Sequence, residues 1–237
     1  MRKFGSLNAL DSFSDEKAPW VLVFHGYGAD AFDLFPLHEV ISLKNPLNWI
    51  FPQGTIEVPV GPGWTGRGWW NIDIAQIQRD AAQGVERDLS QESNPQLTTT
   101  RQKVLAAIET MKVPWSQIIL GGFSQGAMLA VDLYLHAPQN PRGLFLWSSA
   151  LVNKTEWKAR TQSEEFKSRQ KEIPHPTFFQ SHGTQDSVLT LKNGQRLEGF
   201  LQSLGMKGKL NSFVGGHEIP PQIITGTSAY LATISGS

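Results

Sequence analysis

Ser124 stands in a pattern that could make it a nucleophile. It is the centre of residues 122–126, Gly-Phe-Ser-Gln-Gly, which follow the apolar run 117–122 and precede the almost wholly apolar segment 125–137. When a strand turns into a helix within so few residues, the serine is held outward on a strained turn, and small neighbours leave room for the backbone. The helix N-terminus then favours the negative charge that develops during acyl transfer. The alternative is an ordinary glycine-rich turn between a strand and a helix.

A serine hydroxyl needs a base, and the base needs an acid to orient it. In a strand–serine–helix site, the expected chain order is serine, acid and then histidine. Asp186 follows an expected strand by a few residues, and His217 lies in a glycine-rich loop after the last expected strand. Because the carboxyl ends of parallel strands share one edge of a sheet, both loops are expected at the edge where Ser124 lies. The sequence therefore predicts Ser124 as nucleophile, His217 as base and Asp186 as orienting acid.

Two glutamates compete with Asp186 for the role of the acid. Glu198 falls in the middle of an expected helix, whereas Glu218 is adjacent to His217 and would have to curl back onto it. Asp186 on its own could equally cap a helix or close an Asx turn. Its place in the order of serine, acid and histidine is what favours the catalytic interpretation.

Other histidines are weaker candidates for the base. His136 lies on the same expected helix as Ser124 and cannot fold back to it. His175 stands between two prolines just before an expected strand, at the opposite edge of the sheet, and is interpreted as a solvated loop residue. His182 ends a strand at the correct edge but precedes the acid, so we assign it a supporting role in the turn.

The turn 25–30, His-Gly-Tyr-Gly-Ala-Asp, follows another expected strand. Its small residues can aim a main-chain N–H at the space above Ser124, as an oxyanion hole requires. We predict the backbone N–H groups of Tyr27 and Gln125 as the two donors, the Tyr27 side chain mattering less. His25 is expected to brace the turn through its ring nitrogens, the alternative being a capped strand end.

Three tryptophans, Trp64, Trp69 and Trp70, crowd into one glycine-rich stretch that is expected to be an irregular loop. Trp69 and Trp70 could line an acyl or alcohol pocket, since such pockets are largely aromatic and apolar. Packing of the loop onto the core is the competing interpretation. Residues 61–66 match G-x-G-x-x-G but run into more glycine and tryptophan instead of a helix, so they predict no dinucleotide site.

Short apolar runs alternate with helical patterns, which predicts an α/β fold with a mostly parallel sheet and helices on both faces. The expected strands are 20–24, 48–51, 117–122, 143–149, 176–182 and 209–216. The expected helices are 98–112, 125–137, 190–204 and 218–234. The charged segment 153–173 is interpreted as a solvated helix, and a cap over a pocket is the alternative.

Length and composition favour one domain over residues 1–237, in which residues 1–18 could be a loosely packed N-terminal segment. The chain has 237 residues, 40% of them hydrophobic, and no cysteine. The lack of cysteine excludes disulfide frameworks, thiolate metal sites and cysteine nucleophiles. Neither Asp73, Asp80 nor the histidines adopt metal-ligand spacing, so we expect no metal and no cofactor.

Charge and hydropathy also limit the partners. Lys and Arg number 21, as do Asp and Glu, so the formal net charge is zero. This balance disfavours nucleic acid and anionic membrane surfaces. The N-terminus lacks the apolar stretch of a signal peptide, and no apolar run approaches the roughly 20 residues of a membrane span. We therefore expect a cytoplasmic protein without stable membrane insertion, and the oligomeric state stays open.

Six stretches together resemble the carboxylesterase and lysophospholipase family that includes acyl-protein thioesterases. They lie between about Trp20 and Pro220 and read, in the family's order, FHGYGAD, FPQG, GRGWWNID, LGGFSQGAM, SHGTQDSV and GGHEIP. The resemblance implies an α/β-hydrolase fold without a large cap domain. It also implies Ser124, Asp186 and His217 as the triad. Asn71 stands where the family usually has an aspartate, which concerns substrate preference more than chemistry.

The leading hypothesis is a serine hydrolase that cleaves carboxylic esters or thioesters through an acyl-enzyme, with a small-molecule or lipid-like substrate. One alternative is a catalytically silent scaffold of the same fold that binds a ligand or partner. Another is a peptidase or acyltransferase, because one triad can serve several acyl-transfer reactions.

Overall fold

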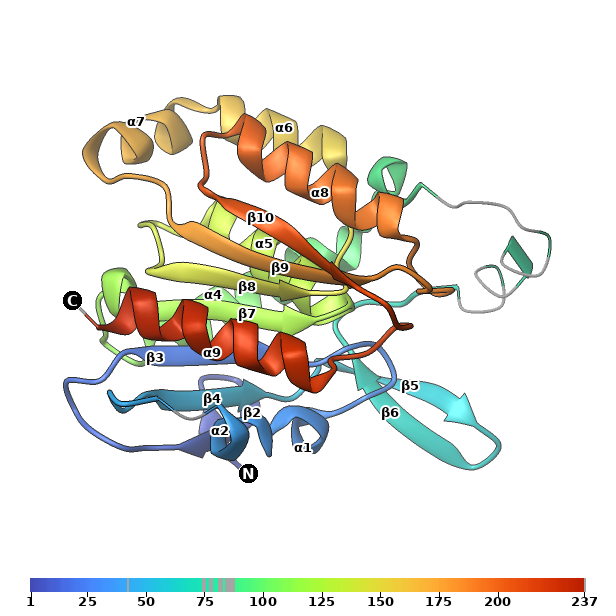
Figure 1. Ribbon diagram of the computed structural model, residues 1–237, viewed down its shortest axis with the longest axis horizontal. Helices are drawn as coiled ribbons and strands as arrows, with labels where there is room; N and C mark the ends of the chain where they lie inside the picture. The colour runs from blue at the N-terminus through green and yellow to red at the C-terminus, as the bar shows by residue number, and fades with distance from the viewer. Residues whose placement is uncertain (42, 74–75, 77–78, 81–82, 84–87, 237) are drawn as a thin grey trace.

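An eight-stranded sheet forms the centre of the computed structural model (Figure 1), with the strand order β1-β2-β4-β3-β7-β8-β9-β10. β1 and β2 run antiparallel to their neighbours, and the remaining strands are parallel. The structure describes residues 1–41, 43–73, 76, 79–80, 83 and 88–236. The strands of this sheet are Arg2–Phe4, Leu7–Ser12, Trp20–Phe24, Asn48–Pro52, Ile118–Phe123, Gly143–Trp147, Thr177–Gly183 and Gly208–Phe213.

Helices cover both faces of the sheet. The buried side chains of α4 to α8 belong to one apolar core, and those of α1 and α9 belong to a second core on the other face. Figure 1 shows α9 in front of the sheet and α4 and α5 behind it. No helix in the described part of the chain is long and apolar enough to cross a membrane. The helices α1, α2 and α4 to α9 are Ala31–Leu34, Leu37–Val40, Pro95–Glu109, Gln125–His136, Lys154–Gln162, Glu164–Glu172, Leu191–Ser203 and Pro221–Ser235.

All six strands expected from the sequence are present, as β3, β4 and β7 to β10. These strands are apolar at nearly every position because helices bury both faces of the sheet. A sheet with one solvated face would instead have polar residues at alternate positions. α5 is apolar almost all round for the same reason, because it lies buried against the sheet. The α/β class with a mostly parallel sheet is therefore confirmed.

Residues 2–12 are paired and packed, which corrects the expectation of a loose N-terminal segment for that part of residues 1–18, whereas residues 13–17 are exposed. Residues 2–4 and 7–12 form β1 and β2, and β2 pairs with β4. Phe4, Leu7 and Ala9 are buried in the core. These strands are short and half polar, so their signal depends on the pairing of β2 with β4, which lies far along the chain.

The stretch that contains Trp64 is a β-hairpin rather than a loop. β5 (Ile56–Gly61) and β6 (Trp64–Gly68) pair antiparallel and extend away from the body of the molecule (Figure 1). Trp64 is 75% exposed, so it packs neither on the core nor in a pocket. Proline and several glycines within the pair weaken the sequence signal for strands. The G-x-G-x-x-G match falls on the hairpin tip and does not begin a helix.

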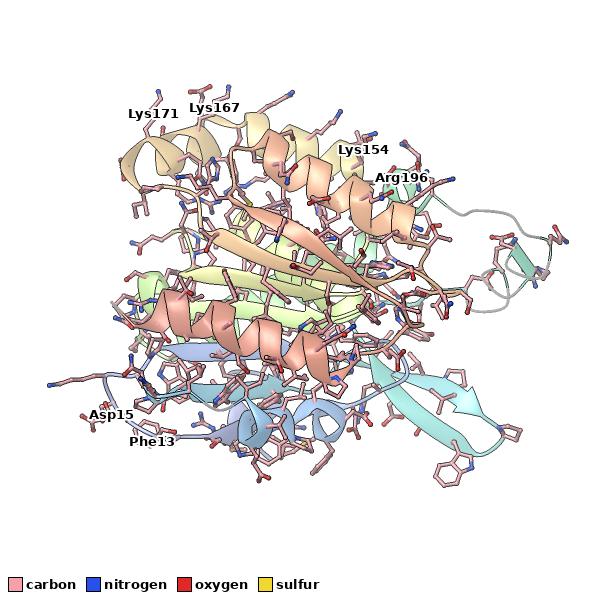
Figure 2. All side chains as sticks on the ribbon, in the orientation of Figure 1. Phe13, Asp15, Lys154, Lys167, Lys171 and Arg196 are labelled. Carbon is pink, nitrogen blue, oxygen red and sulfur yellow. The ribbon has the colours of Figure 1, made fainter. Side chains whose placement is uncertain are left out.

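Segment 153–173 folds as two helices, α6 and α7, rather than one. Ser163 ends the first and caps the second, its hydroxyl accepting a hydrogen bond from the N–H of Phe166 at 3.2 Å. Trp157 and Phe166 are buried in the core on the α5 side of the sheet. Figure 2 shows Lys167 and Lys171 pointing outward, away from the body of the protein. One face of the segment is therefore solvated, and the other packs into the helix layer.

The buried carboxylate of one residue, Asp132, links three helices of this layer, α4, α5 and α6. Asp132 on α5 accepts hydrogen bonds from Arg101 at 3.1 Å and from the indole Nε1 of Trp157 at 2.8 Å. Burial raises the pKa of Asp132 to about 6, against the opposing effect of Arg101. The carboxylate therefore depends on its partners for stabilisation.

Replacing Asp132 by alanine is expected to lower the free energy of unfolding by about 3 kcal/mol, because a buried cation loses its main partner. Arg101 keeps a 3.1 Å contact with Glu156, so the loss falls at the low end of the usual range. Urea unfolding of Asp132→Ala measures it. Lys167→Ala, at an exposed position on α7, is the control and should leave the midpoint in place. An unchanged midpoint in Asp132→Ala would contradict this account.

Candidate active site

Ser124 lies at the sharp turn between β7 and α5. Its φ of 54° and ψ of −120° place an L-residue in a strained region of backbone space. Such a conformation persists only where the surroundings hold it. The Ser124 N–H donates to Trp147 O on the neighbouring strand at 2.9 Å, and the N–H of Ala127 donates to Ser124 O at 3.0 Å. The predicted strand–serine–helix turn is thus present.

The turn after β3 crosses directly over the start of α5. A Cβ built on Gly126 would lie 2.0 Å from the carbonyl oxygen of Phe24, so only glycine allows this close approach. Gly26 in turn packs against Ser124, because a Cβ added there would be 3.5 Å from the serine Cβ. The crossing brings the turn 25–30 to the serine.

His217 and Asp186 meet at the carboxyl ends of β9 and β10. The Nδ1 of His217 lies 2.6 Å from Oδ2 of Asp186, which makes Nδ1–H the donor to the carboxylate. The two loops are joined by the main-chain hydrogen bond from Gln185 N–H to Gly215 O, at 2.9 Å. With its proton on Nδ1, the ring keeps a free lone pair on Nε2, as a general base requires.

His217 contacts the serine turn at the side chain of Phe123. The ring of Phe123, the residue before Ser124, lies 4.7 Å from the imidazole ring, centroid to centroid. Within the described part of the chain, the Ser124 hydroxyl makes no hydrogen bond to His217. Such contacts are often long in enzymes without substrate and tighten in the complex. The structure thus joins His217 to Asp186 directly and to Ser124 through a shared neighbour, and the proton transfer between them stays a prediction.

Asp186 uses its two oxygens for different purposes. Oδ1 accepts the N–H groups of Val188 at 2.9 Å and Leu189 at 2.8 Å, which closes an Asx-type turn. Oδ2 faces His217. Asp186 therefore both closes the turn and contacts His217. The turn fixes the orientation in which the carboxylate meets the imidazole ring.

The His182 side chain lies next to this carboxylate. It is buried, its Nε2 donates to Leu189 O at 2.6 Å, and the same nitrogen lies 3.4 Å from Oδ2 of Asp186. Burial is the largest cause of a lowered pKa for His182. The ring is therefore neutral at neutral pH and steadies the Asp186 turn without adding a charge, the supporting role that the sequence predicts.

The predicted oxyanion donors lie on adjoining segments. Within the described residues, neither the main-chain N–H of Tyr27 nor that of Gln125 has a hydrogen-bond partner. Gln125 is the first residue of α5, where backbone N–H groups have no partner inside the helix. Both donors are thus available to a developing oxyanion, and their joint action remains a prediction.

His25 braces the oxyanion turn through both ring nitrogens. Nε2 accepts the N–H of Gly54 at 2.9 Å, so the proton resides on Nδ1, which donates to Gly26 O at 2.8 Å. Burial lowers the pKa of His25, which favours this neutral form. The turn is thereby held to the end of β4.

The two predicted pocket tryptophans differ. Trp69 is fully buried, and its Nε1 donates to His25 O at 2.8 Å, so its side chain belongs to the core. Trp70 is 5% exposed and borders a cavity of about 220 Å³ shared with residues 71–73, 92–94, 97 and 152–153. The core interpretation is correct for Trp69 because the indole N–H finds its partner inside the protein.

Two histidines that were set aside lie elsewhere. His136 is at the far end of α5, with Nδ1 donating to the carbonyl oxygen of Asp132 at 2.9 Å. His175 is partly buried rather than solvated, with Nδ1 2.7 Å from the hydroxyl of Tyr134. The expectation for His175 was wrong because the segment before β9 folds back onto α5, a contact that its flanking prolines do not signal.

Comparison with known proteins agrees with the fold. The sequence profile of the Phospholipase/Carboxylesterase family matches residues 8–235. Acyl-protein thioesterase 1 of Cryptococcus neoformans is 29% identical over 79% of this chain and 74% of its own length. That of Candida albicans is 23% identical, with 82% of each chain covered.

Solved structures share the fold over nearly the whole chain. Esterase PE8 has a TM-score of 0.77 at 23% identity, covering 96% of this chain and 99% of its own. Acyl-protein thioesterase 2 of Zea mays has a TM-score of 0.70 at 20% identity, covering 97% and 99%. The chain therefore belongs to the phospholipase/carboxylesterase family and has the α/β-hydrolase fold.

Proposed function

We propose that the protein hydrolyses carboxylic esters or thioesters through an acyl-enzyme formed on Ser124. His217 accepts the hydroxyl proton through Nε2 as the serine oxygen bonds to the substrate carbonyl carbon. The same proton passes to the leaving alcohol or thiol as the carbon–oxygen or carbon–sulfur bond breaks. Water then attacks the acyl-enzyme with His217 again as base, which releases the acid and restores the serine.

Asp186 acts on the base rather than on the substrate. By accepting the Nδ1 proton of His217, it holds the ring in the tautomer whose Nε2 is free, and it stabilises the imidazolium that forms in the transition state. The N–H groups of Tyr27 and Gln125 would receive the negative charge on the carbonyl oxygen. The observation that carries this assignment is the 2.6 Å hydrogen bond between His217 and Asp186, at the sheet edge that holds the strained serine.

The relatives support the substrate class. Proteins with this fold and with related sequence are named esterase and acyl-protein thioesterase. A small-molecule or lipid-like ester or thioester is therefore the proposed substrate. Trp70 is retained as a candidate pocket residue because it borders the cavity of about 220 Å³. Its carbonyl oxygen accepts a hydrogen bond from the side chain of Gln125 on α5.

Labelling with a fluorophosphonate probe tests the assignment directly. The probe bonds to activated serines, so mass spectrometry of the labelled peptides should find the adduct on Ser124. Side-by-side hydrolysis of matched ester, thioester and amide substrates then defines the bond that is cleaved. An adduct on another serine, or no adduct at all, would overturn the proposed nucleophile.

The pH dependence of kcat/KM reports the base. An imidazole changes charge between about pH 5 and 8, and only its neutral form accepts a proton, so kcat/KM should rise with pH and then level off. Burial lowers the pKa values of His25 and His182, so both rings lose their proton at lower pH than an ordinary imidazole. The rise is therefore expected to report His217. Intrinsic fluorescence should show an intact fold throughout, and a flat profile from pH 5 to 9 would contradict the role.

A further inference from the structure

The side chain of Gln125 makes contacts that its main-chain role does not require. Its Oε1 accepts the N–H of Trp69 at 2.9 Å, and its Nε2 donates to Trp70 O at 2.7 Å. The residue is 0% exposed, so water does not compete for either bond. A single side chain thus holds two successive peptide units from a segment about 55 residues earlier in the chain.

The segment that Gln125 holds also supports the turn of the other oxyanion donor. Arg67 makes two main-chain hydrogen bonds with that turn, accepting from Gly28 N–H and donating to Ala29 O, each at 2.8 Å. The Trp69 indole donates to His25 O at 2.8 Å. Residues 67–70 are therefore bonded to the segment on either side of Tyr27.

Packing leaves this segment little freedom. A Cβ on Gly66 would lie 1.9 Å from Gly28 O, so the hairpin strand and the turn are in direct backbone contact. A Cβ on Gly68 would lie 3.1 Å from the Tyr27 ring. The hydroxyl of Thr100 fixes the other side by donating to Trp69 O at 2.6 Å. Residues 66–70 form a strut between α5 and the Tyr27 turn.

We propose that the Gln125 side chain is a positioning residue that sets the separation of the two oxyanion donors, its own N–H and that of Tyr27, through residues 66–70. The inference rests on the proposed function and deepens it. One donor begins α5 and the other lies in the turn after β3, and these two segments also touch directly at Gly126 and Gly26. To this packing contact the strut adds directional hydrogen bonds at both of its ends.

The physical consequence follows from how an oxyanion hole works. Its donors must point at the place where the oxyanion forms, and they stabilise the transition state only because they are already in position. Losing the Gln125 amide would leave the Trp69 N–H and the Trp70 carbonyl without their partner, and the strut would relax. Ground-state binding would change little, because the donors act mainly on the charged intermediate.

Gln125→Met is the central test, since it removes both hydrogen bonds while keeping the volume and the main-chain N–H. We expect kcat for a short-chain p-nitrophenyl ester to fall about 10- to 100-fold, a range set by the cost of misplaced groups, with KM changed less than about threefold. The pH at which kcat/KM is half-maximal should stay in place, because the His217–Asp186 pair is untouched. A lower plateau of kcat/KM with an unshifted midpoint would show that the substitution affects the oxyanion hole and not the base.

Asn48→Leu is the matched control. Asn48 is likewise a 0% exposed amide that clamps main chain, accepting from Ser14 N–H at 2.7 Å and donating to Ala18 O at 3.0 Å. It lies at the amino end of β4, at the opposite edge of the sheet from the serine. Both variants should lose thermal stability, and Asn48→Leu should keep kcat within about twofold. A merely structural role for Gln125 would make the two variants alike in kcat.

Gln125→Glu provides a rescue. A protonated carboxyl can accept from Trp69 N–H and donate to Trp70 O, and burial favours that neutral form. Its kcat should exceed that of Gln125→Met near neutral pH and should decline as the carboxyl ionises at higher pH. Equal kcat for the Met and Glu variants at every pH would contradict the proposal.

The result that would overturn the inference is a Gln125→Met enzyme with wild-type kcat. If fluorophosphonate still labels Ser124 in that enzyme and in the wild type, only the role of the side chain fails. If the wild type shows no labelling of Ser124, the proposed function itself fails. The two failures are therefore distinguishable in one set of measurements.

Discussion

Ser124→Ala is expected to lower kcat for p-nitrophenyl acetate or butyrate by about 10⁴- to 10⁶-fold, the range for loss of a triad nucleophile. The variant keeps the backbone of the strand–serine–helix turn and the oxyanion donors but has no side-chain oxygen to form the acyl-enzyme. Fluorophosphonate labelling should disappear with the activity. Steady-state hydrolysis and gel detection of the probe measure the two effects on the same protein.

Ser148→Ala is a close control for this variant. Ser148 also follows a parallel strand, β8, and also has a positive φ, 47°. The loss of a hydroxyl from a strained turn at the same sheet edge is thereby matched, without loss of the nucleophile. Ser148→Ala should keep kcat within about threefold. Wild-type turnover in Ser124→Ala would refute the acyl-enzyme on this residue.

Asp186→Asn has the second largest expected effect, a fall in kcat of about 10⁴-fold. The asparagine oxygen can still accept from Val188 and Leu189 N–H, so the turn survives. Its amide group, however, would face Nδ1 of His217 as a donor, which favours the tautomer with the proton on Nε2. A ring in that form cannot accept the serine proton. Single-turnover kinetics should show that acylation is the step that slows.

Two glutamate variants decide between Asp186 and its competitors. Glu218 accepts the N–H of Gly216 at 3.1 Å, and Glu198 accepts the N–H of Leu210 at 2.8 Å, so each has a local structural use. Glu218→Gln and Glu198→Gln should keep kcat within about threefold. A large loss in either one, together with an active Asp186→Asn enzyme, would move the orienting acid away from Asp186.

The parts of the fold that the sequence predicted are those with a strong local signal. β3 and β7 are buried on both faces, so their apolar runs need no partner to be recognised. The β5–β6 hairpin and the N-terminal strands were missed because proline, glycine and half-polar alternation hide strands whose stability comes from pairing.

The site shows the same division. The order of Ser124, Asp186 and His217 was visible because each follows a recognisable strand. Trp69 was misassigned because an aromatic residue in a glycine-rich stretch reads the same whether it lines a pocket or fills the core. Only the partner of its indole N–H, His25 O, separates the two possibilities.

By itself the sequence determined the serine turn and the order of the candidate site residues, because a strained serine between a strand and a helix is encoded within a few adjacent residues. The tertiary structure alone decided that the proton of His217 lies toward Asp186 and that the Gln125 amide clamps Trp69 and Trp70. These contacts join segments that lie 31 and about 55 residues apart. Their geometry depends on the packing of the whole sheet edge, which no local pattern records.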